Sequence, residues 1–432
     1  MFNNFKKVIN KAVIVAKGSN FKNVSKMLLG TLSSQVILFL LAPILYRIYD
    51  KVDYGTIGQF MALNSFALVF VTLQLNYTIL IEDSEYMARN AIKSIHTIVT
   101  ACVLILLLII LPIKQDISTI LGNPDMNYWL IFIPFTVYLN SRLDAFKTWA
   151  NRKEEYSVFG KTLLLEAIIG PLISIPYGLY YKTGTGLFLG FFISLLVSNI
   201  FIYRCLKEKP PIGFNSFIRT KFFVIKNKFY PLFQLPSQGL KIFSEQLPLY
   251  LLSIFTSPEM IGIYNLSVRV VNLPFQVISS SMSSVYNKRL VESYNLTENS
   301  KRIFTKMLLM LFSIGIIPLI VVYIFGVPLF SWYFGEKWSL SGKLSSVLVV
   351  LYFFRFIYTS LSYSFILTRK QIYDLFFTIL ILATSCLVLY VGLSTSKNLI
   401  ETLKTYSIII SLILIFATYF SFTILPKNNN QV

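Results

Sequence analysis

The chain has 432 residues, of which 55% are hydrophobic and only 13% are charged, and its mean hydropathy is +0.66. This charged share is about half that of a soluble domain, so polar side chains cannot cover a globule of this size. The composition excludes an ordinary soluble protein and indicates a membrane protein. The formal net charge of +20 needs an explanation of its own.

The chain begins with a basic segment, residues 1–26, which carries six lysines, no acid and no long apolar core. It therefore lacks the pattern of a cleavable signal peptide. Helical spacing is followed by the apolar residues Phe2, Phe5, Val8, Ile9, Ala12 and Val13, which favours an amphipathic helix on an anionic membrane surface. The alternative is a disordered basic tail.

Apolar runs of about 20 residues then recur, each long enough to cross the hydrocarbon layer as a helix. Runs such as ACVLILLLIIL (Ala101–Leu111) lack the alternation of an outer-membrane barrel strand. We therefore expect an all-α polytopic membrane protein with about twelve transmembrane helices. The predicted spans are 27–46, 57–81, 94–113, 128–146, 161–181, 185–205, 231–256, 260–285, 304–326, 344–366, 372–393 and 405–425.

Lys and Arg are distributed unevenly between the two sides that these spans define. With the N-terminus inside, 27 of the 39 basic residues fall in cytoplasmic segments, eight in outer loops and four inside spans. This asymmetry predicts that both termini are cytoplasmic. It also accounts for the net charge without nucleic acid. The basic central loop, residues 206–230, is expected to set topology and to contact anionic lipids.

A short internal repeat links the two halves of the chain. YRIYDKVDYGTIGQFMAL (Tyr46–Leu63) and SIFTSPEMIGIYNLSV (Ser253–Val268) each contain an acid followed by a glycine, and Gly55 and Gly262 are 207 residues apart. Six spans separate the copies, so the halves have the same orientation, related by an axis along the membrane normal. We expect six-helix bundles at 27–205 and 231–425, joined by linker 206–230 and followed by a cytoplasmic tail, 426–432.

Embedded polar residues of the first half are few. Asn76 lies on one face of span two, and Asp83 lies at the exit of that span. Arg142 lies near the cytoplasmic end of span four, with Asp144 close by. We expect Arg142 to reach towards the interface. Glu166, one turn into span five, is a candidate for ion pairing or for proton transfer.

Span seven carries two charges near its middle, on one polar stripe. Gln234, Gln238, Lys241 and Glu245 recur at three- and four-residue steps, which places them on one helix face. Lys241 and Glu245 are one turn apart and can neutralise each other. The alternatives are a structural ion pair and a solvated pathway, and the length of the stripe favours the pathway.

Spans eight and ten contain arginines without an acid nearby on the same helix. Asn265, Arg269, Asn272 and Gln276 form a stripe in span eight, and Arg355 lies in span ten. Surplus positive charge inside a bundle suits an anionic substrate, and the arginine fork fits phosphate oxygens. The alternative is neutralisation by acids at the span ends. The predicted cationic cavity comprises Arg269, Arg355, Lys241 and Arg142, with Glu245, Glu166 and Asp83 for ion coupling or pairing, and Gln234, Gln238, Asn265, Asn272, Gln276 and Asn76 as polar lining.

Catalytic motifs are absent from the sequence. It contains no HExxH, CxxC or Walker pattern, and a single histidine, His96, excludes a histidine-based metal cluster. We therefore predict no cofactor, no metal and no enzymatic activity. Without a nucleotide site, transport would be passive or driven by an ion gradient.

Three stretches resemble bacterial polysaccharide and O-antigen flippases of the Wzx type, in the multidrug/oligosaccharidyl-lipid/polysaccharide exporter superfamily. They are SSQVILFLLAPILYRIYDKVDYGTIGQF (Ser33–Phe60), Leu247–Glu292 and Phe325–Phe356. The resemblance implies a V-shaped pair of six-helix bundles in the bacterial inner membrane. It implies alternating access that carries undecaprenyl-diphosphate-linked oligosaccharide to the outer leaflet, with H⁺ or Na⁺ coupling. Polysaccharide polymerase and glycosyltransferases are candidate partners.

The sequence is compatible with two alternative functions. A superfamily member that exports another small or lipid-linked substrate would share the fold, but a cationic cargo would favour an acid-lined cavity. A membrane-embedded polymerase or glycosyltransferase would belong to a different class. Such enzymes usually carry a large outer loop with acids or histidines, and the predicted outer loops are short.

Overall fold

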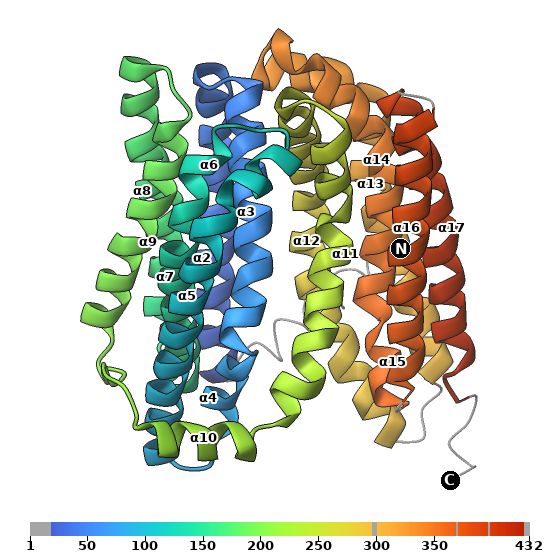
Figure 1. Ribbon diagram of the computed structural model, residues 1–432. Helices are drawn as coiled ribbons and strands as arrows, with labels where there is room; N and C mark the ends of the chain where they lie inside the picture. Colours follow the sequence, from blue (N-terminus) through green and yellow to red (C-terminus); the bar gives the residue numbers. More distant parts are fainter. Residues whose placement is uncertain (1–18, 296–299, 369, 396–397, 427–432) are drawn as a thin grey trace. The chain divides into compact units, whose positions relative to one another are not determined.

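The computed structural model describes residues 19–295, 300–368, 370–395 and 398–426, which form helices and connecting turns without a strand (Figure 1). Residues 1–18 of the predicted basic segment and residues 427–432 of the predicted tail lie outside these residues. The long helices of the first half are α2 (Ser19–Ile48), α3 (Lys51–Thr72), α5 (Glu85–Ile120), α7 (Ile133–Arg152), α8 (Tyr156–Tyr181) and α9 (Thr185–Cys205). Shorter elements between them are η1 (Leu75–Tyr77), α4 (Thr78–Ile81), α6 (Met126–Trp129) and η2 (Leu130–Phe132).

The second half begins after α10 (Phe217–Lys226), a short helix in the central loop. Its long helices are α11 (Leu235–Phe255), α12 (Pro258–Asn295), α13 (Ser300–Phe334), α14 (Ser339–Leu361), α16 (Gln371–Thr395) and α17 (Leu399–Thr423). A π-helical turn, η3 (Tyr230–Gln234), leads into α11, and η4 (Glu336–Trp338) and α15 (Tyr363–Leu367) flank α14.

Each of the twelve predicted spans coincides with a helix, which confirms the all-α polytopic class. Among the described residues, ten helices are long and apolar enough to cross a membrane. The two long helices that miss this criterion are α7 and α11. Three charges, Arg142, Asp144 and Lys147, interrupt α7, and the polar stripe around Lys241 lowers the hydropathy of α11.

The chain divides into two compact units. The first takes in the chain up to Tyr49, Leu63–Gln115 and Met126–Pro236, and the second takes in Asp50–Ala62, Asp116–Asp125 and the chain from Ser237 onwards. The start of α3 therefore clusters with the second half. The predicted bundle limits, 27–205 and 231–425, remain predictions.

Within the second unit, the first turns of α3 and α12 are in backbone contact. A Cβ on Gly55 would lie 1.9 Å from the carbonyl oxygen of Pro258, and a Cβ on Gly262 would lie 1.9 Å from that of Lys51. Gly55 and Gly262 also lie against each other's backbone, so the two copies of the repeat found in the sequence are in direct contact. Small residues at such a crossing allow helices in lipid to approach closely. Lys51 and Glu259 add an ion pair of 2.8 Å at the same place.

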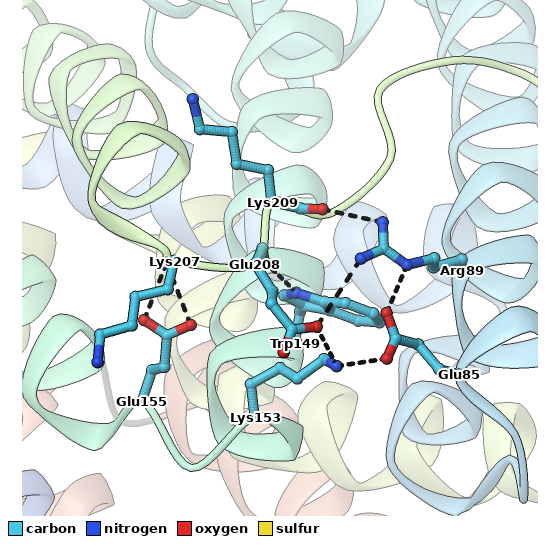
Figure 2. Close-up of polar contacts among 8 residues, drawn as sticks. All are labelled: Glu85, Arg89, Trp149, Lys153, Glu155, Lys207, Glu208 and Lys209. Atoms are coloured by element: carbon cyan, nitrogen blue, oxygen red, sulfur yellow. Dashed lines mark hydrogen bonds and ion pairs between the residues drawn. The ribbon is translucent and has the colours of Figure 1, made fainter.

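In the first unit, a buried tryptophan holds the central loop. Trp149 is fully buried and its Nε1 donates a hydrogen bond of 2.8 Å to the carbonyl of Glu208 (Figure 2). The cations of Arg89 and Lys153 lie 5.2 and 5.1 Å from its ring centroid. Glu85 accepts from both, at 2.7 and 2.8 Å.

The side chain of Glu208 also forms an ion pair with Lys153. Together, Glu85, Arg89, Lys153 and Glu208 form a clamp around Trp149. Partial burial lowers the pKa of Lys153, but its hydrogen bonds to Glu208 and Glu85 outweigh that effect and raise the pKa above its ordinary value. Arg89 also donates to the carbonyl of Lys209 at 3.2 Å. The loop that the sequence marks only as basic is thus attached to α5 and α7 by specific bonds.

Gly55→Ala should destabilise the protein by about 1–3 kcal/mol, because its methyl group must push the α12 backbone away. Gly170→Ala is the matched control, since a Cβ there lies 3.8 Å from the nearest atom and alanine favours a helix. Thermal unfolding of the purified variants in detergent measures the difference. Equal stability of the two variants would contradict the close contact.

Trp149→Ala should release the central loop and cost about 3–5 kcal/mol, whereas Trp149→Phe should cost less, because it keeps an aromatic ring and loses the hydrogen bond and part of the buried volume. Limited proteolysis between residues 206 and 216 reports the release. Trp332→Ala, at a side chain that is 75% exposed, is the control. Wild-type cleavage rates in Trp149→Ala would show that the clamp does not hold the loop.

Candidate functional site

A pocket of about 420 Å³ lies inside the second unit, between α11, α12 and α14. Each helix contributes residues at helical spacing, so the pocket forms where the polar stripes of three helices meet. Its lining residues are Glu245, Gln246 and Leu249 from α11, Tyr264, Asn265, Val268, Asn272, Phe275, Gln276 and Ser279 from α12, and Tyr352, Arg355, Phe356 and Thr359 from α14.

Arg355 supplies the positive charge of this pocket. Its guanidinium carbon lies 5.5 Å from the ring centroid of Tyr352, a cation–π contact that retains the hydrogen-bond donors for other groups. Glu245 acts on it electrostatically, but the described residues include no ion pair between the two. A pocket-facing arginine without a direct carboxylate partner can bind an anion through its planar fork.

Five of the predicted site residues come together here. Arg355 and Glu245 face the pocket together with the three amides Asn265, Asn272 and Gln276. Amide groups both donate and accept hydrogen bonds, as sugar hydroxyls require of a partner. The crossing of α3 and α12 fixes the position of Asn265 along α12. Asn265 lies one turn beyond Gly262, and its side chain fits against Gly58.

Three other predicted residues of the second unit do not line the pocket. Lys241 and Arg269 are exposed, and Gln238 is half-buried. In the part of the chain that the structure describes, Lys241 forms no ion pair with Glu245. The pocket lies on the side of Glu245 where Gln246 and Leu249 project, and Lys241 is on the other side.

The remaining predicted residues belong to the first unit, so the pocket does not contain them. Glu166 lies 2.8 Å from the Nζ atom of Lys147, and the Arg142 guanidinium lies 5.1 Å from the ring centroid of Phe146. Asp83 is exposed in the turn before α5. Asn76 is in η1 and Gln234 is in η3.

The aromatic walls of the pocket were missing from the sequence-based prediction. Tyr264, Tyr352, Phe275 and Phe356 are almost fully buried and line it beside the polar groups. The sequence did contain a signal for Tyr352, because Tyr352, Arg355 and Thr359 are three and four residues apart and therefore share one face of α14. Aromatic residues are so common in this chain that their position alone did not distinguish them from lipid-facing residues.

The lining offers anion binding and hydrogen bonding, with aromatic surface around them. Among the described residues, no group of three or more His, Cys, Asp or Glu is placed to hold a metal ion. The pocket is therefore suited to holding a ligand that carries both negative charge and hydroxyl groups.

Several solved structures have a similar fold. Lipid II flippase MurJ, in an inward closed conformation, aligns with a TM-score of 0.74 and 13% identity over 93% of this chain and 88% of MurJ. An inward-facing multidrug resistance MATE family transporter aligns with a TM-score of 0.64 and 12% identity over 89% of this chain and 92% of the transporter. A transporter from Pyrococcus furiosus, of the same MOP superfamily as the MATE transporter, aligns with a TM-score of 0.60 and 13% identity over 92% of this chain and 93% of that transporter. At such identities the likeness establishes the fold.

No curated protein sequence matches the chain. Residues 21–286, more than half of it, match the family described as polysaccharide biosynthesis protein. This match and the folds of the two transporter groups confirm the resemblance to flippases of the superfamily. The chain belongs to the polysaccharide biosynthesis protein family.

Proposed function

We propose that this protein is a flippase that moves undecaprenyl-diphosphate-linked oligosaccharide from the cytoplasmic to the outer leaflet of the bacterial plasma membrane. The proposal depends above all on the position of Arg355, which faces a pocket lined by amides and aromatic rings. Membership in a polysaccharide biosynthesis family and a fold like that of lipid II flippase MurJ support it.

In this proposal Arg355 binds the diphosphate, since a guanidinium pairs with two phosphate oxygens at once. Asn265, Asn272 and Gln276 bind sugar hydroxyls, and the prenyl chain stays in the bilayer. The pocket opens alternately to the two sides of the membrane. Lys241 and Arg269, which are exposed on two of the pocket's helices, contact the parts of the substrate outside it.

The orientation and the driving force belong to the same proposal. The excess of Lys and Arg places both termini in the cytoplasm. Phe217 and Phe222 of α10 are 81% and 69% exposed beside Arg219 and Lys221, which suits contact with anionic lipids. A gradient of H⁺ or Na⁺ drives the cycle, with Glu245 and Glu166 as candidate coupling groups. Glycosyltransferases act before the flip, when they assemble the oligosaccharide, and a polysaccharide polymerase acts after it.

Arg355→Ala should lower the rate of substrate transfer by about tenfold to a hundredfold, because a charged hydrogen bond contributes about 1.5–3 kcal/mol. The assay measures the appearance of a diphosphate-linked oligosaccharide in the opposite leaflet of proteoliposomes. Arg355→Lys should retain part of the activity, since it keeps the charge and loses the fork. Lys343→Ala, an exposed basic residue on the same helix, is the control.

Three outcomes would count against the proposal. Normal transfer by Arg355→Ala would separate the pocket from the substrate. Lengthening of the glycan without leaflet transfer would indicate a polymerase. Transport of cationic drugs without transfer of the lipid-linked glycan would indicate an exporter of another substrate.

Glu245→Gln should strengthen binding of the diphosphate-linked substrate by up to about tenfold, because it removes a negative charge that faces the same pocket as Arg355. Titration of purified protein with the substrate measures the affinity, and Glu336→Gln, at an exposed residue, serves as control. Weaker binding by Glu245→Gln would show that Glu245 itself holds the ligand.

A further inference from the structure

We infer that the second unit also binds an anionic phospholipid, in a groove on its surface that is separate from the polar pocket. The groove has a volume of about 510 Å³ and is formed by α13, α14 and α17. Its lining is apolar apart from two threonines and a tyrosine. The lining residues are Phe304, Thr305, Leu308, Leu309, Phe312, Phe354, Ile357, Ile415, Thr418, Tyr419 and Phe422.

The groove is open to the surface of the unit, so an acyl chain can enter it from the bilayer. On α13 the lining residues Thr305, Leu308 and Phe312 follow one helix face, and the same spacing recurs on α17. Leu309 is 61% and Tyr419 is 62% exposed at its edges, whereas Phe304 is buried at its floor. An open apolar groove between spans accommodates an acyl chain.

Positive charge at one end of the groove identifies the headgroup. Lys301 lies one turn before Thr305, and its Nζ atom is 5.1 Å from the ring centroid of Phe422, a lining residue. Arg302 and Lys306, both exposed, lie on the same turns of α13. Basic residues at the mouth of a groove between spans bind lipid phosphates. The combination selects an anionic phospholipid over a zwitterionic one.

The helix α14 separates this groove from the pocket proposed for the substrate. Phe354 and Ile357 face the groove, and Arg355 and Thr359 face the pocket. A single lipid-linked glycan with its diphosphate at Arg355 therefore does not extend directly into the groove. A resident phospholipid fits this separation, and the inference does not depend on the identity of the transported substrate.

The test uses the full-length protein in neutral detergent, titrated with dioleoyl phosphatidylglycerol or dioleoyl phosphatidylcholine and followed by native mass spectrometry. Phosphatidylglycerol should bind more tightly than phosphatidylcholine. Leu309→Trp, which fills the groove, and Lys301→Glu, which reverses the charge, should each weaken its binding by about tenfold. Ile317→Trp is the matched control, because Ile317 is 63% exposed on another face of α13.

The variants also distinguish the sources of the ligand. Equal binding of the two phospholipids, or unchanged binding to both Leu309→Trp and Lys301→Glu, would overturn the inference. Undecaprenyl phosphate that displaces phosphatidylglycerol from the wild type and fails to bind Leu309→Trp would also overturn it, since the groove would then hold a prenyl chain. Thermal unfolding of the lipid-free variants shows that they are folded.

Discussion

The contact between Gly55 and Gly262 is the constraint on which the pocket depends. Each glycine leaves room for a backbone carbonyl of the other helix, so the start of α12 is held against the start of α3 without intervening side chains. Asn265 follows one turn later and fits against Gly58. Asn272 and Gln276 lie on the same face further along α12. The position of this polar stripe is therefore determined at the crossing.

A membrane protein has to place its polar groups where lipid does not reach them. The polar pocket places the charge of Arg355 against Tyr352 and within the field of Glu245. A direct ion pair would neutralise the arginine and leave little affinity for an anion. The aromatic walls lower the local polarity, which strengthens any charge interaction that a ligand makes there.

The helices could be predicted from the sequence because apolar runs of sufficient length have few alternatives in a bilayer. Part of the pocket lining could be predicted as well, since Arg355, Glu245 and Asn272 are costly in lipid and are expected to face the interior of a bundle. Which edge of each stripe faces the pocket could not be predicted. Lys241 is one turn from Glu245 in sequence, yet it is on the side away from Gln246 and Leu249. That outcome is determined by helix rotation, which depends on packing.

The clamp around Trp149 illustrates the same limit. The sequence places Glu85, Trp149 and Glu208 far apart, and a count of charges gives only an excess of lysine and arginine. In the fold, two cations lie against one ring and two acids join them. A basic loop can therefore contain a specific attachment as well as a topology signal.

The helix α14 connects the polar pocket and the apolar groove of the second unit, because it lines both. In an 18-residue window of each candidate span, 67% of the residues are buried for α14 and 11% for α13, so α14 is the more interior of the two helices. One face of α14 presents Arg355 to the polar pocket, and the opposite face presents Phe354 and Ile357 to the apolar groove. A rotation of this helix would move both surfaces together.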